Sequence, residues 1–326
     1  MVAAPVAATV RELPGRALRS GFLWAAHRRS LQRVATGLPL TRGVVWRFVA
    51  GETMDQALGA LERLRDVGFH TTADVLGESV TDAGMAEDAA ERYVRLLDAL
   101  AARGLDGNVS LKLTQMGLDL DPDLCRVNVA RVVGHAAELG AFVRVDMEDH
   151  TRTEATLALV RELHATLDNV GTVIQAYLRR SADDIERLDQ AGIRVRLCKG
   201  AYDEPASVAY PHKAEVDESF GRLMERLLEA GAYPALATHD ERIVERARRF
   251  ADGRGIGPER FEFQMLYGVR RDLQERLRRQ GYTVRVYVPF GREWYPYFMR
   301  RLAERPANVL FITRSVLREG RGARSR

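Results

Sequence analysis

Two lysines of this sequence stand at positions suited to a reactive or ligand-binding cation. The chain has 46 Arg but only three Lys, which are Lys112, Lys199 and Lys213. Lys112 and Lys199 end the apolar, strand-like runs VSLK and VRLCK. An ammonium is a compact charge whose geometry differs from that of a guanidinium, so lysines in so Arg-rich a chain are predicted to be site residues. They would bind an anion or act as Schiff-base nucleophiles. The alternative is that these lysines are present by chance and have no role at a site.

Other polar side chains also lie at or near the ends of apolar runs. Asp146 follows FVRV, Gln175 lies in TVIQAYL and His239 lies in LATHD. Polar groups in apolar segments are costly unless they are paired or face a ligand, so the pattern predicts a pocket for a large polar ligand. The candidates are Glu78, Lys112, Asp146, Met147, Gln175, Arg196, Lys199, Gly200, Ala201, Thr238, His239, Asp240, Gln264, Leu266 and Tyr287.

The elements that must position these side chains alternate between short apolar runs and helical patterns. Eight strands are predicted, at residues 70–76, 109–113, 142–147, 172–178, 193–198, 235–238, 261–266 and 283–288. The helical segments have apolar residues at steps of three and four, as in Tyr93, Leu96, Leu97 and Leu100. They include residues 86–103, 123–139, 152–167, 181–191, 214–230 and 270–279.

This alternation predicts an α/β fold, a single (β/α)8 barrel, with a doubly wound sheet as the weaker option. Residues 1–60 have helical pattern without a strand and are interpreted as an N-terminal helical arm. Residues 61–313 would form the catalytic barrel, and residues 314–326 a basic C-terminal tail. Because catalytic groups of such barrels lie at the C-terminal ends of the strands, the polar candidates should converge there.

Composition limits the classes to which the protein can belong. With 46% hydrophobic and 29% charged residues, and no apolar run near the eighteen or so residues of a membrane span, an integral membrane protein is excluded. Cys125 and Cys198 lack the spacing of a disulfide framework or a zinc site, so no metal is expected and a reducing, cytoplasmic location is predicted.

Basic charge is concentrated at the two ends of the chain. Residues 1–50 carry eight Arg and one Glu, a charge of +7, and residues 314–326 carry five Arg and one Glu, a charge of +4. Since the whole chain is +4, the middle is 4 − 11 = −7, which argues against nucleic-acid binding. The ends are interpreted as solvated tails, with peripheral contact to an anionic membrane surface or an organellar transit peptide as alternatives.

Seven motifs in order resemble those of proline dehydrogenase, the flavoenzyme of proline catabolism. They are SLKLT, FVRVDMEDH, IQAYL, VRLCKGAY, LATHD, FEFQMLYG and RVYVPFG followed by YFMRRLAE, over about residues 70–304. The length is similar to that of the monofunctional bacterial type. The resemblance implies a distorted (β/α)8 barrel with FAD at its C-terminal face and the last helix over the barrel mouth. Cys198 and Asp240 depart from the usual motif residues, and the second departure leaves the contact at that position open.

The resemblance also implies how the substrate is held. The helix predicted at residues 293–304 places Tyr297, Arg300, Arg301 and Glu304 on one stripe. Arg300 and Arg301 would bind the proline carboxylate with Lys112 as a third cation, because guanidinium groups bind carboxylates bidentately. Leu266 and Tyr287 would wall the proline ring. Glu78 would act as a gate that pairs with Arg300 when substrate is enclosed, with a solvated loop acid as the alternative.

By the same resemblance, Asp146 and Arg196 are the catalytic candidates. Arg196 would stabilise negative charge on reduced flavin. Asp146 would either orient the substrate amine or hold Lys112, and the sequence does not decide between these roles. The expected cofactor-binding residues are Met147, Gln175, Arg196, Lys199, Gly200, Ala201, Tyr202, Thr238, His239 and Gln264.

The expected reaction is oxidation of L-proline to Δ1-pyrroline-5-carboxylate by hydride transfer to FAD, with a membrane quinone as electron acceptor. No GxGxxG motif follows a strand, so a Rossmann site is not indicated. Two other interpretations remain, a Schiff-base aldolase barrel using Lys112 or Lys199 and a barrel that binds its ligand without turnover. The oligomeric state is left open.

Overall fold

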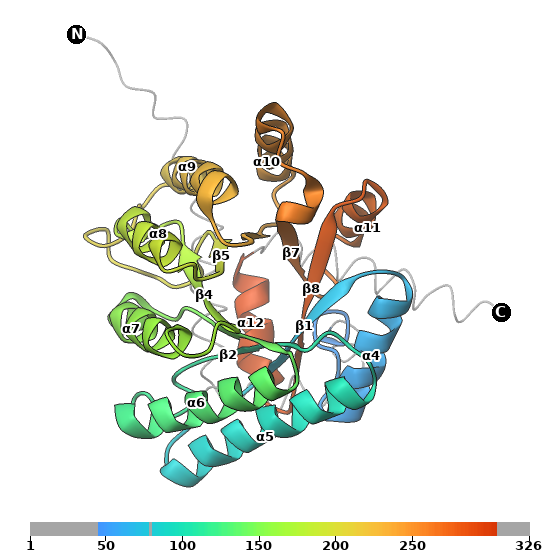
Figure 1. The fold of residues 1–326 in the computed structure, drawn as a ribbon, viewed down its shortest axis with the longest axis vertical. Coiled ribbons are helices and arrows are strands. Elements are labelled where there is room, and N and C mark those ends of the chain that lie inside the picture. Colours follow the sequence, from blue (N-terminus) through green and yellow to red (C-terminus); the bar gives the residue numbers. More distant parts are fainter. Residues whose placement is uncertain (1–44, 78–79, 305–326) are drawn as a thin grey trace, which may run out of the picture.

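Eight parallel strands close into a barrel, as the sequence predicts (Figure 1). The computed structural model describes residues 45–77 and 80–304, the last five of these as backbone only. Each strand pairs with the next in parallel, and β8 pairs with β1 to close the barrel. The strands are β1 (His70–Val75), β2 (Asn108–Leu111), β3 (Phe142–Val145), β4 (Val170–Gln175), β5 (Val195–Cys198), β6 (Ala235–Ala237), β7 (Glu262–Leu266) and β8 (Thr283–Phe290).

Helices surround the strands of the barrel (Figure 1). They are α4 (Met54–Asp66), α5 (Ala83–Ala102), α6 (Pro122–Glu138), α7 (Thr153–His164), α8 (Ser181–Gln190), α9 (Lys213–Ala230), α10 (Glu241–Arg254) and α11 (Arg271–Arg279). Short 3-10 turns, η2 (His150–Arg152) and η3 (Pro258–Arg260), precede α7 and β7. The helix α10 is not among the helices named from the sequence, and its buried face consists of Ile243, Val244, Ala247 and Ala251.

Local sequence signals explain where these helices begin. Asp82 caps α5 by accepting the Met85 N–H at 2.9 Å, and Asp240 caps α10 by accepting the Arg242 N–H at 3.1 Å. Thr53 and Gln56 form a capping box at the start of α4. Such caps satisfy backbone N–H groups that have no partner within the helix.

The last helix, α12 (Trp294–Glu304), lies over the barrel mouth instead of in the outer ring, as expected (Figure 1). It packs against Leu76, which directly follows β1, and against residues 45–49 of the chain's N-terminal part. The indole N–H of Trp294 donates to Glu52 at 3.0 Å. In the outer ring, α4 stands between α5 and α11, the place that a helix after β8 would otherwise fill.

The expected division at residues 60 and 313 stays a prediction. The helix α4 continues through residue 60, and its buried Ala57, Leu58 and Leu61 join the main core. Residues 1–44 and 305–326 lie outside the described residues. None of the helices within residues 45–77 and 80–304 is both long and apolar enough to cross a membrane.

Charged residues fill the inner, N-terminal end of the barrel. Both carboxylate oxygens of Glu262 on β7 accept from Arg285 Nε of β8 at 3.0 Å. Burial opposes ionisation of Glu262, but the Arg285 charge and its hydrogen bonds keep the pKa of this carboxyl below its usual value. Arg144 on β3 donates to the carbonyls of Thr172 and Arg194 at 3.1 and 2.6 Å. This paired layer supports the groups above it at the barrel mouth.

Candidate active site

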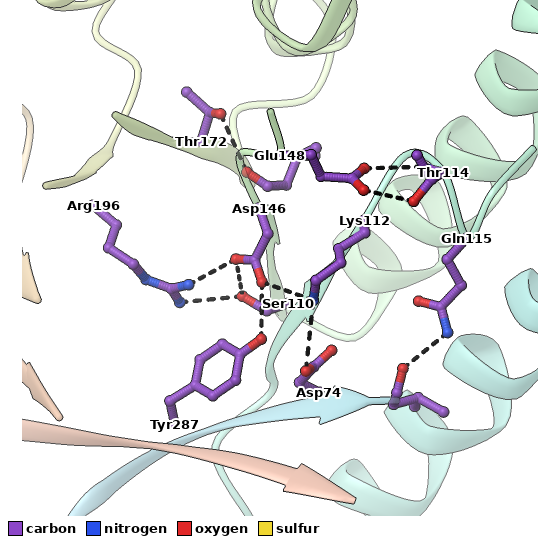
Figure 2. A network of polar contacts seen from close by, with 12 residues as sticks. Asp74, Ser110, Lys112, Thr114, Gln115, Asp146, Glu148, Thr172, Arg196 and Tyr287 are labelled. Carbon is purple, nitrogen blue, oxygen red and sulfur yellow. Dashed lines mark hydrogen bonds and ion pairs between the residues drawn. The ribbon is translucent and has the colours of Figure 1, made fainter. Parts of the chain in front are cut away.

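Asp146, the residue after β3, stands at the centre of a polar network at the barrel mouth (Figure 2). Its Oδ1 accepts from Ser110 Oγ at 3.0 Å and from Arg196 Nη1 at 2.8 Å. Its Oδ2 accepts from the Tyr287 hydroxyl at 2.8 Å and lies 3.4 Å from Lys112 Nζ. Burial opposes ionisation, but Lys112 and Arg196 outweigh it and lower the pKa of Asp146. Three expected site residues, Lys112, Arg196 and Tyr287, therefore meet around the ionised carboxylate of a fourth, Asp146.

Arg196, in the middle of β5, is fixed on several sides. Its Nη2 donates to Ser110 Oγ at 3.1 Å, and its Nε donates to Gln264 Oε1. The guanidinium carbon lies 5.2 Å from the centre of the Tyr287 ring, a cation–π distance. The amide of Gln264 donates in turn to Glu262 in the charged layer below. Arg196 is therefore a buried cation in a fixed orientation, with Gln264 between it and Glu262.

Lys112 lies between two carboxylates. Besides Asp146, its Nζ is 3.7 Å from Oδ2 of Asp74 on β1, whose side chain is 1% exposed. Asp74 also accepts from the hydroxyl of Tyr93 at 3.3 Å. Sequence reasoning missed Asp74, although an acid inside the apolar run HTTADVL was the available signal. It also missed Ser110, a small polar residue within the predicted strand that carries no distinctive signal.

On the β6 and β7 side of the mouth, His239 and Leu266 are joined. The backbone N–H of Leu266 donates to His239 Nε2 at 2.9 Å. A neutral ring in this arrangement carries its proton on Nδ1. The Thr238 hydroxyl accepts the Asp240 N–H at 3.1 Å, so Thr238 helps to shape the start of α10. Leu266 is half-buried at the end of β7.

Lys199 is held by acids at the starts of two helices. Its Nζ donates to Asp217 on α9 at 2.5 Å and to Asp240, the cap of α10, at 3.0 Å. This geometry identifies the contact of Asp240, which the sequence left open. Gln175, at the end of β4, donates to the carbonyl of Glu148 at 2.9 Å and so joins the β3 and β4 loops. Met147, the residue after Asp146, is buried.

Gly200 has a backbone that only glycine adopts readily. Its φ is +115°, and a Cβ there would lie 2.4 Å from the ring of Tyr177. The absence of a side chain at this position therefore makes room for Tyr177. Ala201 and Tyr202 follow and are half-buried.

The residues expected to bind the substrate carboxylate and to form the gate are only partly described. Arg300 and Arg301 lie on α12, which the fold brings over the mouth, and only their backbone is described. Glu78 lies outside the described residues. Tyr297, on the same helix, is 6% exposed and belongs to the cluster that packs α12 in place. Among the described residues, no group of three or more His, Cys, Asp or Glu is arranged to hold a metal ion.

Comparisons with known proteins point to one family. A family model described as proline dehydrogenase matches residues 57–314. The proline dehydrogenase of Deinococcus radiodurans is 43% identical over 309 residues, covering 92% of this chain and 98% of that protein. Proline dehydrogenase 1 of Bacillus subtilis strain 168 is 39% identical over 302 residues, covering 93% of this chain and 100% of that protein.

A solved structure shares the barrel. The crystal structure of proline utilization A (PutA) from Bdellovibrio bacteriovorus, inactivated by N-propargylglycine, aligns with a TM-score of 0.76 at 29% identity. The alignment covers 81% of this chain but only 33% of that larger one. The matched family region takes in all eight strands and the network around Asp146. The chain therefore belongs to the proline dehydrogenase family.

Proposed function

We propose that this protein oxidises L-proline to Δ1-pyrroline-5-carboxylate. The ring CH2 carbon bonded to nitrogen, and not the carbon that bears the carboxylate, loses a hydride. The nitrogen loses a proton, and a C=N bond forms. The observation that carries the proposal is the Asp146 carboxylate, joined to Lys112, Arg196 and Tyr287 at the mouth of a barrel of this family. Such a site presents both charge signs to a zwitterion in a partly buried setting.

The donor set at the mouth fits FAD. The buried Arg196 supplies a cation, Gln175 an amide, Thr238 a hydroxyl and His239 an imidazole, from the neighbouring strands β4 to β6. When bound, FAD supplies the two-electron acceptor, and the protein supplies position and charge. Lys199 is already paired with Asp217 and Asp240, so a cofactor phosphate would share that cation with them.

For Asp146 we favour a positioning role over that of a general base. Its two oxygens already accept from Ser110, Arg196 and Tyr287 and lie near Lys112. The lowered pKa of Asp146 makes it a poor proton acceptor near neutral pH. The carboxylate would fix Lys112 and Arg196 and present negative charge to the substrate amine.

We assign binding of the substrate carboxylate to Arg300, Arg301 and Lys112, and the wall of the proline ring to Leu266 and Tyr287. A Schiff-base mechanism through Lys112 is disfavoured, because two carboxylates near its Nζ stabilise the ammonium, whereas a nucleophile must be the neutral amine. The electrons would pass from the flavin to a membrane quinone. The protein would be cytoplasmic, with its basic ends making peripheral contact with the inner face of the membrane.

The test is direct. The purified protein should be yellow, and L-proline should bleach the flavin absorption anaerobically. Treatment with borohydride and a carbonyl substrate should trap no covalent adduct on Lys112 or Lys199. A folded, colourless protein that cannot be reconstituted with FAD would overturn the proposal, and binding of proline without flavin reduction would favour a non-catalytic barrel.

A further inference from the structure

The connection between β5 and α9, residues 199–212, wraps around the side chain of Tyr177. It contains no helix or strand. The Tyr177 N–H donates to the Lys199 carbonyl at 3.0 Å, and the Tyr210 N–H donates to the Tyr177 carbonyl at 2.8 Å. Gly200 lets the backbone pass directly against the Tyr177 ring. Connections of this length without secondary structure are uncommon in compact domains and are often functional, so the means by which this one is ordered matters.

A buried acid, Glu204, ties this connection down. One of its oxygens accepts the backbone N–H of His150 at 2.8 Å and the hydroxyl of Tyr177 at 3.3 Å, and the other contacts His150 Nδ1. The Glu204 side chain is 3% exposed. A carboxylate so buried is tolerated only when it is well hydrogen-bonded, and all these bonds reach residues outside its own connection.

The Tyr177 hydroxyl extends the link towards the mouth. Burial first, and then the Glu204 charge, raise the pKa of Tyr177, so the hydroxyl stays protonated. It can therefore donate to Glu204 while it accepts the backbone N–H of Tyr202. Tyr202 is thus held through its main chain by the same pair of side chains.

Three consecutive loops at the barrel mouth meet at this point. His150 begins η2 four residues after Asp146, Tyr177 comes two residues after the end of β4, and Glu204 lies in the connection after β5. The same three loops carry Met147, Ala201 and Tyr202, and Gln175 ends the strand before one of them; all four are expected to contact the cofactor. Loss of the link would therefore release the backbone that these residues share.

We propose that Glu204, acting through His150 and Tyr177, is a positioning residue that holds the Gly200–Tyr202 backbone in place for cofactor and substrate. The proposal rests on the proposed function, because it assigns a task to that same site. Without the link, the binding-competent arrangement of residues 199–212 would be only partly populated. The apparent affinity would then fall by the populated fraction, while chemistry in the assembled site would change little.

The chain offers a matched control on the outside of the barrel. His135 on α6 and Asp98 on α5 form a similar pair, with Nε2 and Oδ1 2.7 Å apart. The Asp98 side chain is 56% exposed and joins two outer helices, not mouth loops. Asp98→Ala removes a histidine-paired carboxylate as Glu204→Ala does, but it should leave the site unaffected.

The experiment compares wild-type holoenzyme with Glu204→Ala, Glu204→Gln and Asp98→Ala. Hydrogen–deuterium exchange is followed in both FAD-free and FAD-loaded protein, and FAD Kd, proline KM and kcat are measured. Glu204→Ala should speed exchange in residues 199–212 and raise FAD Kd and proline KM about tenfold, with kcat within about threefold of wild type. Glu204→Gln keeps an oxygen acceptor and should recover part of the affinity, and Asp98→Ala should match wild type.

Unchanged exchange at residues 199–212 and unchanged FAD affinity in Glu204→Ala would overturn the proposal. Faster exchange throughout the barrel would do the same, because it would show a general structural role. If Glu204→Ala does not fold, Tyr177→Phe removes the hydroxyl alone and must give the same local pattern in smaller measure. A wild-type protein that binds no FAD would overturn the proposed function alone, because exchange in the FAD-free variants still decides whether Glu204 holds this segment.

Discussion

The hydroxyl of Tyr287 on β8 donates to the carboxylate of Asp146, after β3, at 2.8 Å across the barrel mouth. Burial and the Asp146 charge raise the pKa of Tyr287 well above its usual value, so the phenol stays neutral and can only donate to the carboxylate. Lys112 and Arg196 keep Asp146 ionised despite its burial. Donor and acceptor are therefore fixed across the neutral pH range. Removal of this hydrogen bond should change the pKa of Asp146, the carboxylate at the centre of the site.

Removal of the Tyr287 hydroxyl should destabilise the ionised form of Asp146. In Tyr287→Phe, loss of a hydrogen bond to the ionised carboxylate, worth about 1.5–3 kcal/mol, should raise the pKa of Asp146. Because the proposed mechanism uses an ionised Asp146, the acid limb of kcat/KM for proline should move to higher pH. Tyr282→Phe, which removes a hydroxyl near Arg248 outside the barrel, is the control and should leave the profile in place. Identical profiles for all three proteins would exclude Asp146 as the group that titrates.

Loss of an arginine from the charged layer below the site should destabilise the fold far more than loss of an arginine from an exposed ion pair. Arg285→Met leaves Glu262 buried without its ion pair, which should destabilise the fold by about 3–5 kcal/mol in urea unfolding at pH 7. The exposed pair Arg276–Glu241 is the control, and Arg276→Met should destabilise the fold far less. Equal effects of the two substitutions would contradict the assignment of a supporting layer.

The Arg285–Glu262 pair also predicts how the stability of the fold depends on pH. The folded-state pKa of Glu262 is lowered, so its contribution to stability is complete above the unfolded value of about 4.3 and is lost as pH falls through the folded value. In Arg285→Met the lowering is removed and burial raises the pKa instead. The stability deficit of this variant should therefore shrink between pH 7 and pH 5, and a deficit that is constant with pH would refute this explanation.

Arg301→Ala should weaken proline binding more than it slows the chemistry. The guanidinium would hold a carboxylate remote from the reacting carbon, so it contributes mainly uniform binding, and KM should rise more than the limiting rate of flavin reduction falls. Loss of a charged hydrogen bond should cost about 1.5–3 kcal/mol. Arg279→Ala, at an exposed pair on α11, is the control. Unchanged proline affinity in Arg301→Ala would remove this residue from the site.

Glu78 and Arg300 should be coupled if they form a gate. Closure over a small substrate would exclude water from the hydride transfer. In a double-mutant cycle on flavin reduction efficiency, Glu78→Ala and Arg300→Ala should be non-additive by about 0.5–3 kcal/mol, and the coupling should shrink with added salt if the pair is partly exposed. Additivity within about 0.3 kcal/mol would place Glu78 outside the mechanism.

Much of the fold could be predicted from local pattern. All eight expected strands are present and each differs from its expected bounds by only a few residues, because a buried parallel strand shows itself as a short apolar run. The helix α10 was not named from the sequence, although its buried residues Ile243, Val244, Ala247 and Ala251 have the spacing of one helix face. The ordered motifs predicted the family and named Lys112, Asp146, Arg196 and Tyr287, which meet at the mouth.

Contacts between strands and loops were decided only by the tertiary structure. Ser110 and Glu204 look ordinary in sequence, and Asp74 shows only as an acid within an apolar run. Each takes part in a network because the fold brings strands or loops far apart in the chain within contact distance. Lys199 looked like a site cation, but the starts of α9 and α10 supply two acids that pair with it. Sequence pattern reports how each segment is buried, whereas the partner of a buried charge depends on register and closure, which no single segment encodes.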